Sequence, residues 1–314
     1  MALKEKINKN IQFYRSVFAR KIRGLYWDIF KPQIFRPVFI VGCSRAGTTL
    51  VYKTYSLSKE LGSLNRETHD FWSLIAPMPE RDWKSHSIEP DKATPSAHRV
   101  ISRYFYSYTQ KNRFVDKNNQ NSLSIPFLNR LFPDAVFVYV KRNPGDNINS
   151  LIEGWKKTDL FGTWSKDLPQ KVSIENGTYR RWCFFLPEGW QQYTESKIEE
   201  VCAFQYRSVN YAILKDLSEI PESRQVHIKY ENILQNPVGT FQAAFEKTGL
   251  AFDSEMQHHC NSVLSNPYNA FFEIKIDKWK SGIHAERVEN VLDTVSDVAK
   301  KLGYSVGPLS RTAS

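Results

Sequence analysis

A loop with glycines, hydroxyl side chains and one cation follows an apolar run close to the N-terminus of the chain. The stretch Val38–Leu50 reads VFIVGCSRAGTTL and contains Gly42, Ser44, Arg45, Ala46, Gly47, Thr48 and Thr49. In such a strand–loop–helix sequence, backbone N–H groups and the helix N-terminus converge on phosphate oxygens. Nucleotide triphosphatases need a Lys directly after the second glycine, and Thr48 stands there instead. We therefore predict an anion site of a different kind, although glycine turns between strands and helices also occur without any ligand.

A second cationic motif follows another apolar run, Val136–Val140. The chain continues with Lys141 and Arg142, where the Walker B strand of a nucleotide triphosphatase would end in Asp to hold Mg²⁺. Pro144 suits the first turn of a helix, which places Arg142 at the strand end and Ser150 on the second helical turn. Alone, the motif would fit a surface ion pair and a helix cap. Together with the first loop, it predicts two anion sites on one edge of a sheet and no metal.

These motifs require a parallel sheet whose carboxyl edge collects them. Apolar runs at 38–41, 113–115, 135–140 and 225–229 are expected as strands, and a helix is expected from Thr49 to near Gly62. We predict an α/β, P-loop-like, three-layer fold with a central parallel sheet of about four or five strands flanked by helices. Residues 37–314 are expected to form a single domain. Two aromatic-rich, mostly helical inserts, at about 64–109 and 155–214, would wall the site.

The first 36 residues differ from the rest of the chain in charge. They hold nine Lys and Arg against Glu5 and Asp28, a net charge of +7 out of +10 for the whole protein. The apolar residues of this segment recur at helical spacing: Ile7, Ile11, Tyr14, Phe18, Ile22, Leu25 and Ile29. The pattern predicts a basic amphipathic helix. Such a helix packs on its own domain, binds a partner, or makes peripheral contact with an anionic membrane.

Composition favours an intracellular protein. The four cysteines lie far apart with no C-x-x-C pair, which argues against zinc or a disulfide framework and for a reducing compartment. No signal peptide or long apolar span is recognisable. We expect a cytoplasmic protein, with the peripheral contact of residues 1–36 at the inner membrane face as an alternative. The oligomeric state is left open.

At these motifs the chain resembles the sulfotransferases that use 3′-phosphoadenosine 5′-phosphosulfate. The loop FIVGCSRAGTTL is similar to the family's 5′-phosphosulfate loop, and Arg142 with Ser150 to its 3′-phosphate pair. Further similar stretches are Asp116-Lys117-Asn118, Tyr230–Leu234 and Lys278-Trp279-Lys280. The aromatic middle of the chain resembles the bacterial and carbohydrate-type branches more than the cytosolic phenol enzymes. The chain departs from many family loops at Ser44 and Ala46, and the loss of a hydroxyl at Ala46 removes one phosphate contact.

The resemblance implies a function and a set of roles. A sulfuryl group would pass in line from 3′-phosphoadenosine 5′-phosphosulfate to the hydroxyl of a carbohydrate, glycolipid or natural product, leaving adenosine 3′,5′-bisphosphate. Arg45 would neutralise the charge on the bridging oxygen, and Lys117 would add a second positive charge. The remaining donor contacts would come from the loop and from two later sites: Ser44, Ala46, Gly47, Thr48, Thr49, Arg142, Ser150, Trp279 and Lys280.

An acceptor hydroxyl also needs a base, and three residues are candidates. Glu67 and His69 follow the first helix, where the family commonly keeps its catalytic Glu or His. We prefer Glu67, because a carboxylate beside Arg66 would stay ionised and can still act as a base if deprotonation accompanies transfer. His69 and His98 are the alternatives. Each is also explicable as a solvated charge or a hydrogen-bonded histidine.

Three other functions compete with this interpretation. A P-loop kinase or ATPase shares the fold, but the missing lysine and the cationic strand end oppose it. A nucleic-acid-binding module would explain the basic balance, yet most of the excess charge lies in residues 1–36 and no recognition motif is present. A catalytically inactive nucleotide-binding relative would fit the Ala46 departure.

Overall fold

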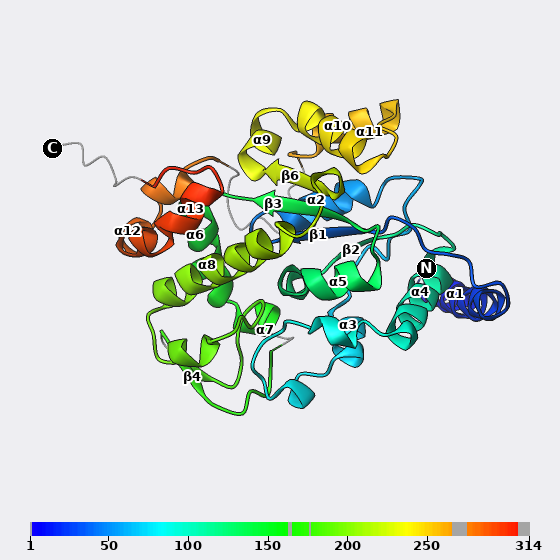
Figure 1. The fold of residues 1–314 in the computed structure, drawn as a ribbon, viewed down its shortest axis with the longest axis horizontal. Coiled ribbons are helices and arrows are strands. Elements are labelled where there is room, and N and C mark those ends of the chain that lie inside the picture. Colours follow the sequence, from blue (N-terminus) through cyan, green and yellow to red (C-terminus); the bar gives the residue numbers. More distant parts are fainter. Residues whose placement is uncertain (1, 163–164, 176, 266–274, 307–314) are drawn as a thin grey trace.

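The computed structural model describes residues 2–162, 165–175, 177–265 and 275–306, with only the backbone for residues 2–9. Four parallel strands form the central sheet in the order β2-β1-β3-β6 (Figure 1). The bounds of these strands are Val38–Gly42 for β1, Val115–Lys117 for β2, Val136–Lys141 for β3 and Gln225–Lys229 for β6. The α/β fold with a parallel sheet is thus confirmed.

Helices cover both faces of the sheet and give it three layers. Their bounds are α1 Ala2–Phe30, α2 Thr48–Tyr55, α3 His69–Ile75, α4 Pro95–Thr109, α5 Ile125–Leu131, α6 Pro144–Trp155, α7 Thr158–Phe161, α8 Ile198–Leu217, α9 Tyr230–Gln235, α10 Pro237–Thr248, α11 Ser254–Ser262, α12 Ala285–Leu292 and α13 Ser296–Lys301. In Figure 1, α2 and α9–α11 lie on one side of the sheet and α5 and α8 on the other. A strand buried on both faces explains the unbroken apolar runs of β1 and β3.

Alternate residues of each strand enter two separate apolar cores. Phe39 of β1 and Phe137 of β3 belong to the core under α5 and α8. Val38 and Val138 belong to the core under α2 and α10. This alternation follows from the period of two in a strand. The parallel direction of the strands brings the loops that follow them to one edge of the sheet.

The expected helix from Thr49 to Gly62 is too long, and the strand expected at 113–115 is displaced. Helix α2 ends at Tyr55, because Gly62 is needed in an extended segment: its N–H donates to the Arg113 carbonyl at 2.8 Å and its carbonyl accepts from the N–H of Val115 at 2.9 Å. Arg113 itself lies outside β2, and its guanidinium donates to the carbonyls that end α10. The end of α2 and the position of β2 thus depend on hydrogen-bond partners that are far away in the sequence.

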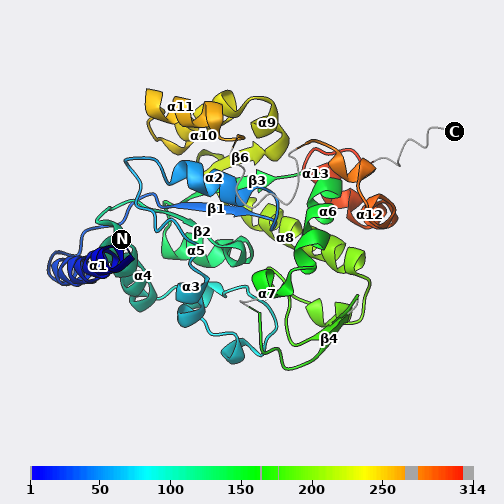
Figure 2. The same ribbon diagram turned by 180° about the vertical axis from the view of Figure 1, so that it is seen from behind.

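The segment expected to be mostly helical at 155–214 contains a small antiparallel hairpin. Strands β4 (Val172–Ile174) and β5 (Gly177–Tyr179) pair there, and a single long helix, α8, closes the segment. No helix within the described residues is long and apolar enough to cross a membrane. Helix α1 lies beside α4 at one end of the molecule, as both views show (Figures 1 and 2).

Candidate active site

The glycine-bracketed loop joins β1 to α2 and turns tightly between them. Gly47, at the N-cap of α2, has φ +97°, and a Cβ there would lie 2.3 Å from Cδ2 of Tyr230. Arg45 also adopts a positive φ of 66°. The Ser122 hydroxyl bonds both the N–H and the carbonyl of Gly42, at 2.9 and 3.0 Å, so the strand end is satisfied there. The loop therefore needs a residue without a Cβ at position 47.

Two guanidinium groups meet at this loop. Arg142 donates to the carbonyl oxygen of Arg45 at 2.7 Å, and Nε of Arg45 donates to Oγ of Ser150 at 3.2 Å. The Arg142 guanidinium lies over the ring of Tyr230, 4.6 Å from its centroid. Burial, reinforced by the neighbouring charge of Arg142, lowers the pKa of Arg45 to about 10. Bringing two cations together in a half-buried site costs free energy, which an anionic ligand would recover.

Buried polar atoms around the loop fit such a ligand. Within the described part of the chain, Oγ of Ser44 and Nε of Arg142 are buried and make no hydrogen bond. The amide of Asn147 donates to the Ser44 carbonyl at 2.8 Å and holds the loop against α6. Buried donors that lack a partner are costly unless a ligand uses them. The residues present therefore suit a phosphate group.

Helix α6 begins as the sequence predicted, and its start fixes Arg142. Pro144 occupies the first turn and the Asn143 side chain caps it by accepting from the N–H of Asp146 at 2.9 Å. Asp146 accepts the backbone N–H groups of Asp277 and Trp279 at 2.8 and 3.1 Å. The carboxylate thus ties the Lys278–Ser281 turn to the same helix.

That turn brings Lys278 to the two arginines and directs Lys280 elsewhere. Burial and the charges of Arg142 and Arg45 are among the causes that lower the pKa of half-buried Lys278. Lys280 is exposed and pairs with Asp277 at 2.8 Å. Trp279 is buried with its ring against Gly145, where a Cβ would lie 2.3 Å from Nε1. Of the two lysines in this turn, Lys278 is therefore the one on which the charges of the arginines act.

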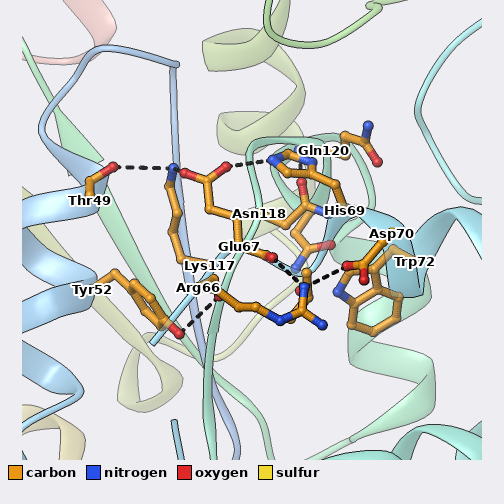
Figure 3. A network of polar contacts seen from close by, with 12 residues as sticks. Thr49, Tyr52, Arg66, Glu67, His69, Asp70, Trp72, Lys117, Asn118 and Gln120 are labelled. Atoms are coloured by element: carbon orange, nitrogen blue, oxygen red, sulfur yellow. Dashed lines mark hydrogen bonds and ion pairs between the residues drawn. The ribbon is translucent and has the colours of Figure 1, made fainter. Parts of the chain in front are cut away.

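A second cluster lies beside the start of α2 (Figure 3). The Glu67 carboxylate stands between Lys117, whose Nζ donates to Oε1, and the His69 ring, whose Nε2 lies 2.5 Å from Oε2. Nζ of Lys117 is also 3.5 Å from Oγ1 of Thr49. The side chain of Glu67 is 34% exposed, whereas Lys117 and His69 are buried at 3% and 2%. Among the three, Glu67 is therefore the group that a second substrate would reach.

The electrostatics of Glu67 favour its ionised form. Burial is the largest single influence and opposes ionisation, but the charge of Lys117 and the hydrogen bonds from His69 and Lys117 together outweigh it. The pKa of Glu67 is therefore lowered well below its usual range. A carboxylate of this kind is available as a proton acceptor at neutral pH, although it is a weak base.

A buried carboxylate on β2 positions this cluster. Asp116 accepts hydrogen bonds from Thr68, Trp72 and Asn121 at 2.7, 2.9 and 2.8 Å. Burial raises the pKa of Asp116 despite these donors. Because Thr68 separates Glu67 from His69, the bond to Asp116 fixes the loop that carries both.

The structure separates the remaining candidates from the site. His98 packs its ring against Phe132, 5.1 Å between centroids, near the starts of β1 and β3 and not their ends. Burial lowers the pKa of His98, and the nearby charge of Asp134 offsets this only in part. Four tryptophans of the two inserts (Trp72, Trp155, Trp182 and Trp190) are buried core residues, and Trp83 is partly buried against the same core. Ala46, by contrast, remains part of the β1–α2 loop, with its side chain buried in the same core. Within the described residues no cluster of three or more His, Cys, Asp or Glu side chains would hold a metal ion.

Two residues at the site, Asn147 and Phe161, carry no signal in the sequence strong enough to find them. Asn147 contacts the loop only through the way α6 packs. Lys278 lies in the stretch Lys278-Trp279-Lys280 noted from the sequence, but only Trp279 and Lys280 were expected at the site. Phe161 of α7 lies under the Arg45 guanidinium, 5.4 Å from ring centroid to carbon. Helix α7 has four residues and no periodic pattern that would predict it.

Comparison with known proteins supports the resemblance stated from the sequence. Residues 37–184 match the model described as the sulfotransferase family, which confirms that resemblance over the loop, β2, β3 and α6. No curated protein matches the chain.

Two solved structures share the fold. The sulfotransferase domain from the curacin biosynthetic pathway is 14% identical, with a TM-score of 0.50, covering 88% of this chain and 100% of that domain. Sulfotransferase STF9 from Mycobacterium avium is 15% identical, with a TM-score of 0.50, covering 93% of this chain and 84% of that one. At such identities the likeness concerns the fold alone.

Proposed function

We propose that this chain, which matches the sulfotransferase family over residues 37–184, transfers a sulfuryl group from 3′-phosphoadenosine 5′-phosphosulfate to an acceptor hydroxyl. The observation that carries the proposal is the pair Arg45 and Arg142 at the glycine loop. Hydrogen bonds to neutral oxygens hold the two guanidiniums close together, and buried donors around them lack a partner within the described residues. A ligand with two separate anionic groups matches this arrangement.

Each end of the donor has a set of residues suited to it. The loop Ser44–Thr49 would hold the 5′ end through backbone N–H groups and the Thr48 and Thr49 hydroxyls. Arg142 and Ser150 would hold the 3′-phosphate, with Trp279 and Lys280 from the sequence and Lys278 from the structure beside them. When bound, the donor supplies a sulfuryl group on a phosphate leaving group.

Lys117 and Arg45 would stabilise charge where the leaving phosphate forms. Nζ of Lys117 lies within 3.5 Å of the Thr49 hydroxyl at the start of α2, so it faces the loop that would bind this phosphate. Fixed cations in a site shielded from water lower the barrier because no solvent must reorganise around the developing charge. A single well-placed donor of this kind typically contributes about 10²–10³-fold in rate.

Glu67 would accept the proton of the acceptor hydroxyl on a carboxylate oxygen. It is the exposed member of the Lys117–Glu67–His69 cluster, and His69 holds its second oxygen. Because its pKa is lowered, proton transfer would accompany sulfuryl transfer and not precede it. We place His69 as the group that orients Glu67. The acceptor is a sugar, a lipid or another small molecule that bears a hydroxyl.

Calorimetry with adenosine 3′,5′-bisphosphate tests the donor site. Arg45→Ala and Arg142→Ala should each weaken binding by about 10–100-fold, because each removes charge-assisted hydrogen bonds worth about 1.5–3 kcal/mol. The exposed Arg287→Ala, whose guanidinium pairs with Glu175, is the matched control and should leave affinity unchanged.

A titration with ATP and Mg²⁺ distinguishes the proposed sulfotransferase from a kinase or ATPase. The proposal expects adenosine 3′,5′-bisphosphate to bind much more tightly than Mg²⁺-ATP. Tighter binding of Mg²⁺-ATP would contradict it. So would an affinity for the bisphosphate that neither arginine substitution changes.

A further inference from the structure

Helix α1 presents its apolar stripe to solvent and docks on the domain through its opposite side. Packing of the apolar stripe on the domain was one of the three alternatives open for this segment. The structure excludes it for the stripe residues whose side chains are described: Ile11, Tyr14, Phe18, Ile22, Leu25 and Ile29, here named the outer face. Their exposed fractions run from 46% to 73%.

The opposite side of α1 is fixed to α4. Trp27 is buried, and Asp28 accepts two hydrogen bonds from Arg103 at 2.8 and 2.9 Å. Arg20 and Arg23 donate to the hydroxyl and the carbonyl of Tyr108, at 2.5 and 3.1 Å. These contacts determine the rotation of the helix about its axis. The exposure of the outer face is therefore built into the way α1 docks.

The exposed apolar surface of the molecule is concentrated on this segment. Of the sixteen large apolar side chains that are exposed in the described residues, ten lie between Ile11 and Phe35. Single exposed apolar residues need no explanation, whereas a continuous apolar strip marks an interaction surface.

Exposed cations flank the outer face on both sides. At about 100° per residue, Arg15 and Lys21 project roughly 60° to either side of the line through Phe18 and Ile29. Among the residues of α1 whose side chains are described, Asp28 is the one that carries a carboxylate, and Arg103 holds it. An apolar strip bordered by positive charge complements a surface that is apolar inside and anionic at its boundary.

The spacing of the outer face fits a flat surface better than a second copy of the helix. Positions 11, 14, 18, 22, 25 and 29 follow an 11-residue repeat, close to the natural helical period, so the strip runs nearly straight along the helix. Pairing two copies face to face would bring Arg15 and Lys21 of each against like charges. An anionic lipid surface meets the same cations favourably.

We propose that the outer face of α1 binds an anionic membrane surface, with the helix lying in the plane of the interface. The apolar side chains would enter the boundary between headgroups and acyl chains, and Arg15 and Lys21 would lie at the headgroup phosphates. This inference does not depend on the proposed sulfuryl transfer.

Sedimentation of the full-length protein with vesicles tests the proposal. The protein should bind vesicles of phosphatidylcholine with about 30% phosphatidylglycerol and bind pure phosphatidylcholine at least tenfold more weakly. Phe18→Ser with Leu25→Ser should reduce binding by at least about tenfold. Arg15→Gln with Lys21→Gln should reduce it by about 30-fold, roughly fivefold for each charge, and high salt should do the same.

A matched control replaces two apolar residues of similar exposure elsewhere, Leu57→Ser with Ile283→Ser, and should bind vesicles like the unchanged protein. All variants are checked for an unchanged circular dichroism spectrum, which is expected because every substituted side chain is exposed. Failure to bind anionic vesicles would overturn the proposal. So would equal binding to neutral vesicles, or a dimer in analytical ultracentrifugation that the Phe18 and Leu25 substitutions dissociate.

Discussion

Glu67 is the residue whose role is argued most strongly from its surroundings. It is the exposed carboxylate of a cluster with Lys117 and His69, beside the start of α2. Glu67→Gln should lower kcat by about 10²-fold, because the amide cannot accept the acceptor's proton. The nearby Asp70→Asn, which removes the charge of an exposed pair with Arg66, is the control and should change kcat by less than about twofold. Full activity of Glu67→Gln would move the role of base to His69.

The lowered pKa of Glu67 predicts a pH dependence of stability. Because the folded pKa lies below the value of 4.5 for an unperturbed carboxyl, the stabilisation from Glu67 is present above pH 4.5 and is lost as pH falls through the folded pKa. Between about pH 5 and 8 the group stays ionised. The difference in unfolding free energy between the unchanged protein and Glu67→Gln should therefore be constant above pH 5 and shrink below pH 4.5. A difference that grows on acidification would contradict the assignment.

Lys278 and Lys280 provide a comparison between structure and sequence. Lys278 faces the two arginines, and Lys280 pairs with Asp277 in solvent. Lys278→Ala should weaken the binding of adenosine 3′,5′-bisphosphate by about tenfold, whereas Lys280→Ala should weaken it by about twofold at most. If calorimetry showed a larger loss of affinity for Lys280→Ala than for Lys278→Ala, the sequence-based expectation that Lys280 binds the donor would stand instead.

At the residue scale, the sequence predicts that Arg45 and Arg142 follow the ends of two strands and that Ser150 lies on the second turn of the helix after the second strand. It does not predict the pairing of Glu67 with Lys117, which lie 50 positions apart. Nor does it predict the contact of Asn147 with Ser44, since that contact arises only when α6 packs against the loop.

Among the elements, the loop between β1 and α2 is the one most constrained by its backbone. Gly47→Ala should lower the free energy of unfolding by about 2–4 kcal/mol, from the positive φ and the overlap with Tyr230, and should abolish binding of the bisphosphate. Gly249→Ala is the matched control. Its φ is +71° and no atom lies within 4 Å of the added Cβ, so it should cost about 1 kcal/mol and leave binding intact. Equal effects of the two substitutions in thermal melts and titrations would disprove the packing argument.

Element boundaries were predicted where local signals decide them and were missed where a remote partner decides them. Strand β6 and the start of α6 lie where the sequence places them, because an apolar run and Pro144 are local features. Helix α2 ends early, because Gly62 forms a parallel β-bridge with Phe114. The hairpin of β4 and β5 lies in the segment expected to be mostly helical, and each of its strands has only three residues.

At the scale of the whole molecule, the parallel sheet brings together residues that are far apart in the chain. Arg45, Lys117 and Arg142 follow or end three adjacent strands, and the carboxyl ends of parallel strands share one edge. This arrangement was predictable once the strands were assigned. The outward rotation of α1 was not, because Asp28, Arg20 and Arg23 set it through α4.

The two apolar cores share the strands of one sheet, so they should unfold together. We expect residues 37–314 to behave as a single domain with one cooperative transition. Melting followed by circular dichroism and by tryptophan fluorescence should give coincident curves. Two separate transitions would show that the α2–α10 core and the α5–α8 core are independent units.

The most direct test of the central claim is a crystal structure with adenosine 3′,5′-bisphosphate. The proposed function predicts the 5′-phosphate in the loop Ser44–Thr49 and the 3′-phosphate between Arg142 and Ser150, with Lys278 beside it. An empty loop, or a nucleotide bound away from both arginines, would contradict the claim.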